Sequence, residues 1–132
     1  MEDWITEPAR ASQIIDFSGL KYKTVSFTDI DALMEYKNRA YIIVEVKYLD
    51  KELPFGQQLA IERMVQDAAR NGKHAIAIVA EHDVEDTQQS VYLQLCNIRC
   101  LYTSVEQKWR KPKYDLNVGK FVSEYLSWLD SR

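Results

Sequence analysis

Two apolar runs joined by a segment with helical periodicity constrain the fold more than any other feature of this sequence. Residues 40–48, AYIIVEVKY, and residues 74–82, HAIAIVAEH, are apolar along most of their length, which is typical of strands buried on both faces of a sheet. Between them, Gly72 follows a segment whose apolar residues have the spacing of one buried helix face. These residues are Ile61, Met64, Val65, Ala68 and Ala69. The order strand, helix, strand predicts a crossover connection and parallel pairing of the two strands.

Further elements are expected on both sides of this unit. β-branched and aromatic residues predict one extended strand over residues 22–33, followed by a polar connection over residues 35–39 with Asn38 in a left-handed turn position. Residues 91–104 predict another strand, and residues 8–15 a short helix. A final helix capped by Asn117 is predicted from an apolar stripe formed by Val118, Phe121, Val122, Tyr125, Leu126 and Leu129. The fold class is therefore α/β, with a mixed β-sheet flanked by helices.

Composition places the chain among ordinary globular proteins. Its 132 residues suit one domain covering residues 1–132, and no linker or internal repeat divides them. No apolar run approaches the roughly 18 residues of a membrane span, and the acidic start lacks the pattern of a secretory signal. With Cys96 and Cys100 as the only cysteines, we expect free, buried thiols in the cytoplasm, although a disulfide between them stays open. The net charge of −3 counts only mildly against nucleic-acid binding.

Four charged residues stand at matching ends of the two N-terminal strands. Side chains alternate along a strand, so Asp29 and Asp31 share one face of the first strand, and Glu45 and Lys47 share one face of the second. If the strands form a hairpin about Asn38, paired residue numbers add to 76, which sets Asp31 opposite Glu45 and Asp29 opposite Lys47. Opposed Cβ atoms lie about 5 Å apart, so two carboxylates there would repel unless a cation such as Mg²⁺ lay between them.

An aspartate, a strand-length gap and Glu45-Val46-Lys47 at the end of an apolar strand resemble the PD-(D/E)XK nuclease superfamily. The following LPFGQQLAIERM resembles the glutamine-bearing helix of its Holliday-junction-resolvase-like and VRR-type branches, with Gln57 or else Gln58 in the glutamine position. The resemblance covers residues 19–81 and lacks a proline before either aspartate. It implies a restriction-endonuclease-like core with the element order αβββαβ.

The resemblance also implies metal-dependent hydrolysis of phosphodiester bonds. Asp31 and Glu45, with Asp29 in reserve and the carbonyl of Val46, would hold Mg²⁺ or Mn²⁺. Lys47 would position or polarise the attacking water, and Gln57 would orient the site or touch the nucleic-acid backbone. A glutamate from an N-terminal helix often completes such sites, for which Glu7 is the first candidate and Glu2 the second.

A basic segment near the C-terminus is a candidate nucleic-acid contact. Cations interleaved with aromatic rings suit phosphate binding and base stacking, although a solvated loop has the same composition. The residues concerned are Lys108, Trp109, Arg110, Lys111 and Lys113. By contrast, His74 and His82 are expected to be surface residues, and the spacing of the two cysteines does not favour a zinc site.

Together these features predict a small DNA nuclease that acts on branched or structured DNA in repair, recombination or phage DNA processing. Such cores usually work as homodimers, since cutting two strands requires two sites, and a recombination or replication protein could be a further partner. A stand-alone core of this length would suit a bacterial or phage protein. The main alternative is a catalytically silent or partner-dependent nucleic-acid-binding module, and a more distant one is an unrelated α/β domain whose four charges are structural.

Overall fold

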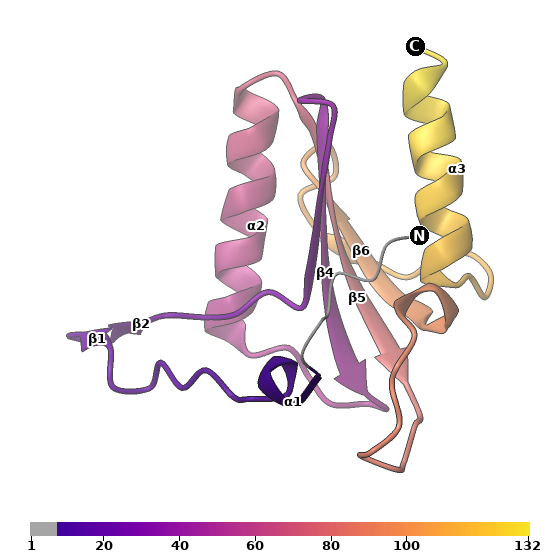
Figure 1. Ribbon diagram of the computed structural model, residues 1–132. Helices are drawn as coiled ribbons and strands as arrows, with labels where there is room; N and C mark the ends of the chain where they lie inside the picture. The colour runs from indigo at the N-terminus through magenta and orange to yellow at the C-terminus, as the bar shows by residue number, and fades with distance from the viewer. Residues whose placement is uncertain (1–7) are drawn as a thin grey trace.

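A five-stranded mixed sheet with one long helix on each face forms the body of the protein (Figure 1). The computed structural model describes residues 8–132. The strands lie in sequence order across the sheet: β3 (Ala32–Tyr36), β4 (Ala40–Tyr48), β5 (His74–His82), β6 (Asn97–Thr103) and β7 (Trp109–Arg110). The remaining elements are α1 (Pro8–Ala11), β1 (Lys21–Tyr22), β2 (Val25–Ser26), α2 (Phe55–Arg70), η1 (Leu93–Leu95) and α3 (Val118–Asp130).

The central strands confirm the expected crossover. β4 and β5 pair in parallel from Ala40 beside His74 to Tyr48 beside His82, and α2 connects them. β3 and β6 pair antiparallel with β4 and β5 respectively, so the sheet is mixed as predicted. The predicted α/β class with helices flanking a mixed sheet is thereby confirmed.

Each face of the sheet has its own apolar core because side chains alternate along β4 and β5. On one face, Ile42 and Val44 of β4 and Ile76 and Ile78 of β5 pack with the apolar stripe of α3. On the other face, a smaller cluster packs against α2 and consists of Ile43, Ile61, Val65, Ala75, Ala77 and Tyr102. Residues 45 and 47 continue the α2 face, since they alternate with Val44 and Val46.

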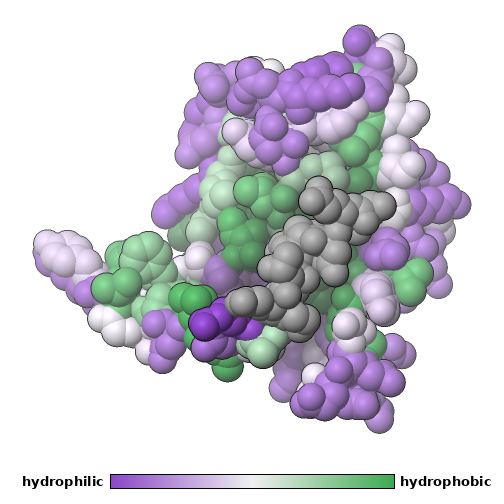
Figure 2. Space-filling view, in the orientation of Figure 1, coloured by the Kyte–Doolittle hydropathy of each residue, from purple (hydrophilic) through white to green (hydrophobic). Residues whose placement is uncertain are grey.

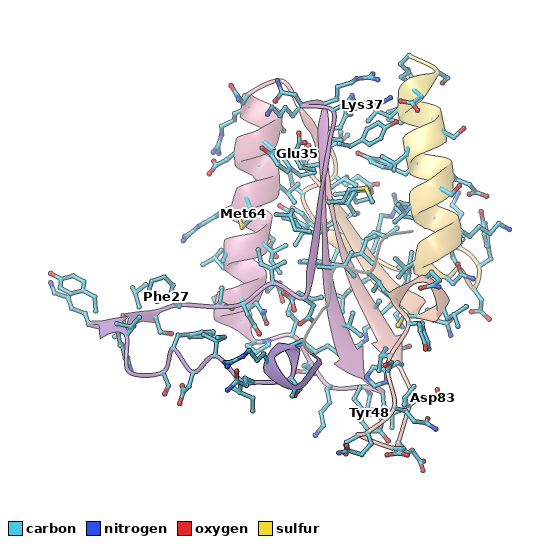
Figure 3. The ribbon with its side chains drawn as sticks, in the orientation of Figure 1. Phe27, Glu35, Lys37, Tyr48, Met64 and Asp83 are labelled. Carbon is cyan, nitrogen blue, oxygen red and sulfur yellow. The ribbon has the colours of Figure 1, made fainter. Side chains whose placement is uncertain are left out.

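α2 turns a narrower face toward the sheet than its sequence indicated. Ile61 and Val65 are buried, but Met64 is 41% exposed, so its placement on the buried face was wrong (Figure 3). Positions 61 and 65 lie one turn apart on the same side, and Met64 falls beside that line and points toward solvent.

This difference predicts unequal costs for two truncations in one helix. We expect Ile61→Ala to lower the free energy of unfolding by about 2–5 kcal/mol, because it leaves a cavity beneath α2. Met64→Ala should change it by less than about 1 kcal/mol, since the side chain is partly exposed and outside the buried cluster and alanine favours helix. Urea unfolding followed by circular dichroism measures both, and equal losses would contradict the burial of only one of them.

The predicted strand over residues 22–33 is wrong in its extent. Lys23 has a φ of 56° and turns the chain back on itself, so β1 and β2 form a separate two-stranded hairpin. β3 then starts only at Ala32 and continues through Tyr36, into the segment expected to be a polar connection. Within the described residues, β3 and β4 are therefore the only strands of the main sheet that precede α2.

The turn between β3 and β4 confirms the expected register. Lys37 and Asn38 have φ values of 50° and 58°, and the amide of Arg39 donates to the carbonyl of Tyr36. Paired residues add to 76 along the whole ladder, from Ala32 beside Val44 to Tyr36 beside Ala40. The left-handed position assigned to Asn38 is also confirmed.

The C-terminal half follows expectation except before β6. Residues 91–104 do not form one strand, because the 3-10 helix η1 occupies Leu93–Leu95 and β6 begins at Asn97. α3 is confirmed, and the side chain of Asn117 caps it by accepting a hydrogen bond of 2.8 Å from the amide of Lys120. The short N-terminal helix is a single turn that ends at Ala11. Among residues 8–132, none of the helices combines the length and apolar character needed to cross a membrane.

Candidate metal and catalytic site

The open end of the β3–β4 hairpin brings Asp31 and Glu45 together. Asp31 immediately precedes β3, one residue beyond the first pair of the ladder, Ala32 with Val44, and its carboxyl group interacts with that of Glu45. Its Oδ2 accepts a hydrogen bond of 2.7 Å from the backbone N–H of Val46. The Asp31 carboxylate thus accepts a hydrogen bond from the backbone of β4 just before β3 begins. This bond fixes the position of the carboxylate against β4.

Glu45 is the one charged residue in the described core. It is 2% exposed, and its Oε1 has no hydrogen-bond partner. Burial, followed by hydrogen bonding to Asp31 and the negative charge of Asp31, raises the pKa of Glu45 to about 8, while the charge of Lys47 acts in the opposite direction. A buried carboxyl oxygen without a hydrogen-bond partner costs stability, so the presence of Glu45 here needs a reason other than packing.

Lys47 lies near Glu45, and Gln57 contacts the backbone just before Asp31. Lys47 is half-buried two residues after Glu45 and shares its side of the strand. Gln57, in the first turn of α2, donates a hydrogen bond of 3.0 Å to the carbonyl of Asp29. The structure therefore places α2 against the segment that carries both aspartates. Asp29 itself is exposed and precedes β3, so no strand pairing sets it opposite Lys47.

The two neighbouring glutamines of α2 have different partners, which allows a matched test. Gln58 donates to Oε2 of Glu62 instead of to the aspartate segment. We expect Gln57→Ala to weaken the apparent Mn²⁺ affinity about tenfold or more, since it frees the backbone that positions Asp29 and Asp31. Gln58→Ala should leave that affinity within about twofold. Titration of Mn²⁺ by calorimetry compares the two, and equal effects would show that the tether to Asp29 has no such role.

The oxygen atoms of Asp31 and Glu45 suit a hard divalent cation. Two opposed carboxyl groups, one of them buried with an unsatisfied oxygen, offer the oxygen ligands that Mg²⁺ and Mn²⁺ prefer. Across residues 8–132, no three His, Cys, Asp or Glu side chains gather closely enough to hold a metal ion. Mg²⁺ commonly uses only one or two carboxylates together with water and substrate phosphate, so a pair is sufficient. The candidate third acids Glu7 and Glu2 lie outside the described residues.

The basic segment lies far from the carboxyl groups within the sheet. β7 is the edge strand opposite β3, so β5 and β6 separate it from β4. Trp109 packs on Tyr102 with ring centroids 5.3 Å apart, and its indole N–H donates to Glu62 at 2.7 Å. Arg110 pairs with Glu106, while Lys108, Lys111 and Lys113 are exposed. The three lysines are thus exposed and can contact another molecule, whereas the indole packs against the core.

The histidines and cysteines do not join the site. His74 stacks edge-on against Trp128, and His82 against Tyr48. Both cysteines are free thiols, Cys96 buried and Cys100 half-buried, as expected, and burial raises the pKa of each.

An ion pair near Lys47 was missed by reasoning from the sequence. Glu81 is the neighbour of Lys47 across the β4–β5 ladder, and its Oε2 lies 3.3 Å from Nε of Arg99. Arg99 also donates to the carbonyls of Leu49 and Lys51, so it fastens the loop that follows β4. Parallel register could have indicated Glu81, but no local pattern indicates the partners of Arg99.

A pocket of about 770 Å³ lies beyond the carboxyl ends of β4 and β5. Its lining includes Glu81, His82 and Asp83 but none of Asp31, Glu45 and Lys47, and Figure 3 shows Asp83 beside Tyr48 at this end of the molecule. The carboxyl pair is thus separate from this pocket. Comparison of the chain with protein-family models, with curated proteins and with solved structures finds no match.

Proposed function

We propose that this chain is a metal-dependent deoxyribonuclease that hydrolyses phosphodiester bonds, with branched or structured DNA as its substrate. The observation that carries the proposal is the buried, unpartnered carboxyl oxygen of Glu45 beside Asp31 at the open end of the β3–β4 hairpin. A divalent cation would satisfy that oxygen and remove the repulsion between the two acids. The neighbouring half-buried Lys47 supplies the positive charge that phosphate chemistry requires.

Each residue of the site has a role in this proposal. Asp31 and Glu45 would hold Mg²⁺ or Mn²⁺, with the carbonyl of Val46 and the carboxylate of Asp29 as further oxygen donors. The bound ion supplies Lewis-acid activation of water and of the phosphate. Nζ of Lys47 donates a hydrogen bond to the attacking water or to a non-bridging phosphate oxygen and stabilises the charge that develops there. Gln57 holds the aspartate segment against α2.

The order of the central elements supports membership of the PD-(D/E)XK superfamily. A hairpin with an acid at its open end, a strand that ends in Glu-x-Lys, a helix with an early glutamine and a parallel strand follow one another, as β3, β4, α2 and β5. We propose that these elements are a restriction-endonuclease-like core. Instead of a third sheet strand before the helix, the described chain has the separate β1–β2 hairpin.

The wider setting follows from this activity. DNA is the expected partner, and a homodimer would supply one site for each strand of a branched substrate. The lysines of residues 108–113 would meet DNA at the far edge of the sheet, and a recombination or replication protein could direct the enzyme to its substrate. The free thiols suit a cytoplasmic location.

Cleavage of a labelled panel of DNA tests the proposal. Single strands, duplex, flaps and four-way junctions of related sequence are incubated with Mg²⁺, with Mn²⁺ and with EDTA. We expect cleavage that needs the metal and is fastest on a flap or junction. Metal-dependent cleavage of intact duplex alone would overturn the substrate class, and absence of cleavage from the whole panel would overturn the nuclease.

The alternative is a nucleic-acid-binding module with a silent site. The unsatisfied oxygen of Glu45 argues against it, because a site released from catalysis has no reason to retain a buried acid beside another. Structure-selective binding without cleavage of any panel member would favour the alternative.

A further inference from the structure

A two-stranded arm, residues 20–27, projects from the body of the protein near the candidate site. β1 pairs with β2 through Tyr22 beside Val25, and Lys23 and Thr24 form the tip. Figure 1 shows the arm extending away from the sheet beyond α2. The arm contributes no residue to either core cluster, so it is a surface element and does not stabilise the interior of the sheet.

The arm presents large side chains to solvent. Tyr22 is 74% exposed and Phe27 64% exposed, and Leu20 and Val25 are also exposed. Figure 2 shows apolar residues on this projection, and Figure 3 places Phe27 along it, outside the sheet. At the base of the arm, the ring centroids of Phe27 and Phe17 lie 6.4 Å apart. Exposed aromatic surface of this kind on a projecting element marks a contact with another molecule.

The charge of the arm indicates which kind of molecule it contacts. Residues 20–27 contain Lys21 and Lys23 and no acidic residue, in a chain whose net charge is −3. Nζ of Lys23 lies 5.5 Å from the centre of the Tyr22 ring. Lys21 and Lys23 precede and follow Tyr22 in the chain, and cations that alternate with an exposed aromatic residue match a nucleic-acid strand, in which bases and phosphates alternate.

The position of the arm relates it to the carboxyl pair. Only Thr28 separates Phe27 from Asp29, whose carbonyl is held by Gln57, and Asp31 follows two residues later. The basic residues 108–113, in contrast, lie at the opposite edge of the sheet. The arm is therefore the basic and aromatic element that is continuous with the candidate site.

We propose that the arm binds unpaired bases of the nucleic-acid substrate, with Tyr22 stacking on a base and Lys21 and Lys23 neutralising the flanking phosphates. This inference rests on the proposed nuclease function and names the feature of the substrate that the site selects. A base can stack on an exposed ring only when its own face is free, as in a single strand, a flap or the branch point of a junction. Intact duplex offers the arm phosphates alone.

Binding measured without cleavage tests the arm independently of catalysis. Fluorescence anisotropy of the whole chain in EDTA compares a labelled single strand and flap with duplex of the same sequence. We expect Tyr22→Ala to weaken binding of the single strand and flap about tenfold and of the duplex much less. Tyr22→Phe, which keeps the ring, should bind like the wild type. No cleavage can occur in EDTA, so failure of catalysis and failure of the arm are distinguishable.

Salt dependence tests the two lysines. Lys21→Gln/Lys23→Gln should reduce the slope of log K against log salt for single strands by about 1.4, which is two phosphate contacts. Lys120→Gln, an exposed lysine on α3, is the matched control and should leave the slope unchanged.

Three results would overturn the inference. The first is wild-type affinity of Tyr22→Ala for single strands, and the second is equal loss in Tyr22→Ala and Tyr22→Phe. The third is dissociation of a dimer by Tyr22→Ala in analytical ultracentrifugation, with loss of binding in proportion, which would make a second copy of the chain the occupant of the arm. Arm-dependent binding by a wild type that cuts nothing would support the arm and reject the nuclease.

Discussion

Lys47→Ala is expected to reduce metal-dependent cleavage by at least about 10²–10³-fold while DNA binding persists. The side chain is half-buried at the end of β4, on the face that carries Glu45, which in the proposed mechanism is where charge would develop on the phosphate. Removing one preorganised donor at such a position typically costs two to three orders of magnitude in rate. Initial rates on the preferred member of the DNA panel, at saturating Mg²⁺, measure the loss.

Lys51→Ala is the matched control. Lys51 is exposed in the loop after β4, four residues further along the chain. Its substitution by alanine removes the same positive charge from the same region. Its rate should stay within about threefold of the wild type. Full activity of Lys47→Ala would show that Lys47 takes no part in the reaction. An equal loss of activity in Lys51→Ala would show that the positive charge near the site, and not the position of Lys47, explains the activity.

Glu45→Gln is expected to stabilise the metal-free protein above neutral pH. The pKa of Glu45 is raised from 4.5 to about 8, so the folded state keeps this carboxyl group protonated while the unfolded state releases its proton. The wild type therefore loses stability as pH rises from 4.5 to 8, by up to about 1.4 kcal/mol for each pH unit. Glutamine resembles the neutral acid and does not titrate, so the variant does not share this loss.

Urea unfolding in EDTA between pH 4.5 and pH 8 measures the difference. Variant and wild type should be similar at pH 4.5, and the variant should be more stable at pH 8 by on the order of 3 kcal/mol. Mg²⁺ should then raise the melting temperature of the wild type but not of Glu45→Gln. Glu124→Gln, an exposed acid on α3, should show neither effect. Equal stability of the Glu45 variant and the wild type at both pH values would contradict the raised pKa.

The closeness of Asp31 and Glu45 was predictable from the sequence because local rules decide the geometry of the hairpin. The turn at Lys37 and Asn38 fixes the register of β3 and β4, and strand alternation then fixes which side chains share a face. Those two rules place Asp31 opposite Glu45 without knowledge of the rest of the fold. The buried strands and the cap of α3 by Asn117 followed from equally local patterns.

Features that depend on distant partners were not accessible in this way. The sequence indicates that the indole of Trp109 is a surface ring in a basic segment, but the ring contacts Tyr102 on β6 and Glu62 on α2. Arg99 fastens a loop about fifty residues away in sequence. The strand expected over residues 22–33 failed because strand propensity does not reveal the reversal at Lys23. Each outcome was decided by tertiary packing or by one backbone angle.

Binding of a divalent cation by Asp31 and Glu45 is the claim on which the proposed function depends most. Calorimetric titration of Mn²⁺ at pH 7.5 into the wild type and Glu45→Gln tests it most directly. The wild type should bind about one ion and release up to one proton, seen by comparing buffers of different ionisation enthalpy, because Glu45 must lose its proton to become a ligand. Glu45→Gln should show little binding and no proton release. Equal binding by the two proteins would place the metal elsewhere and contradict the proposed site.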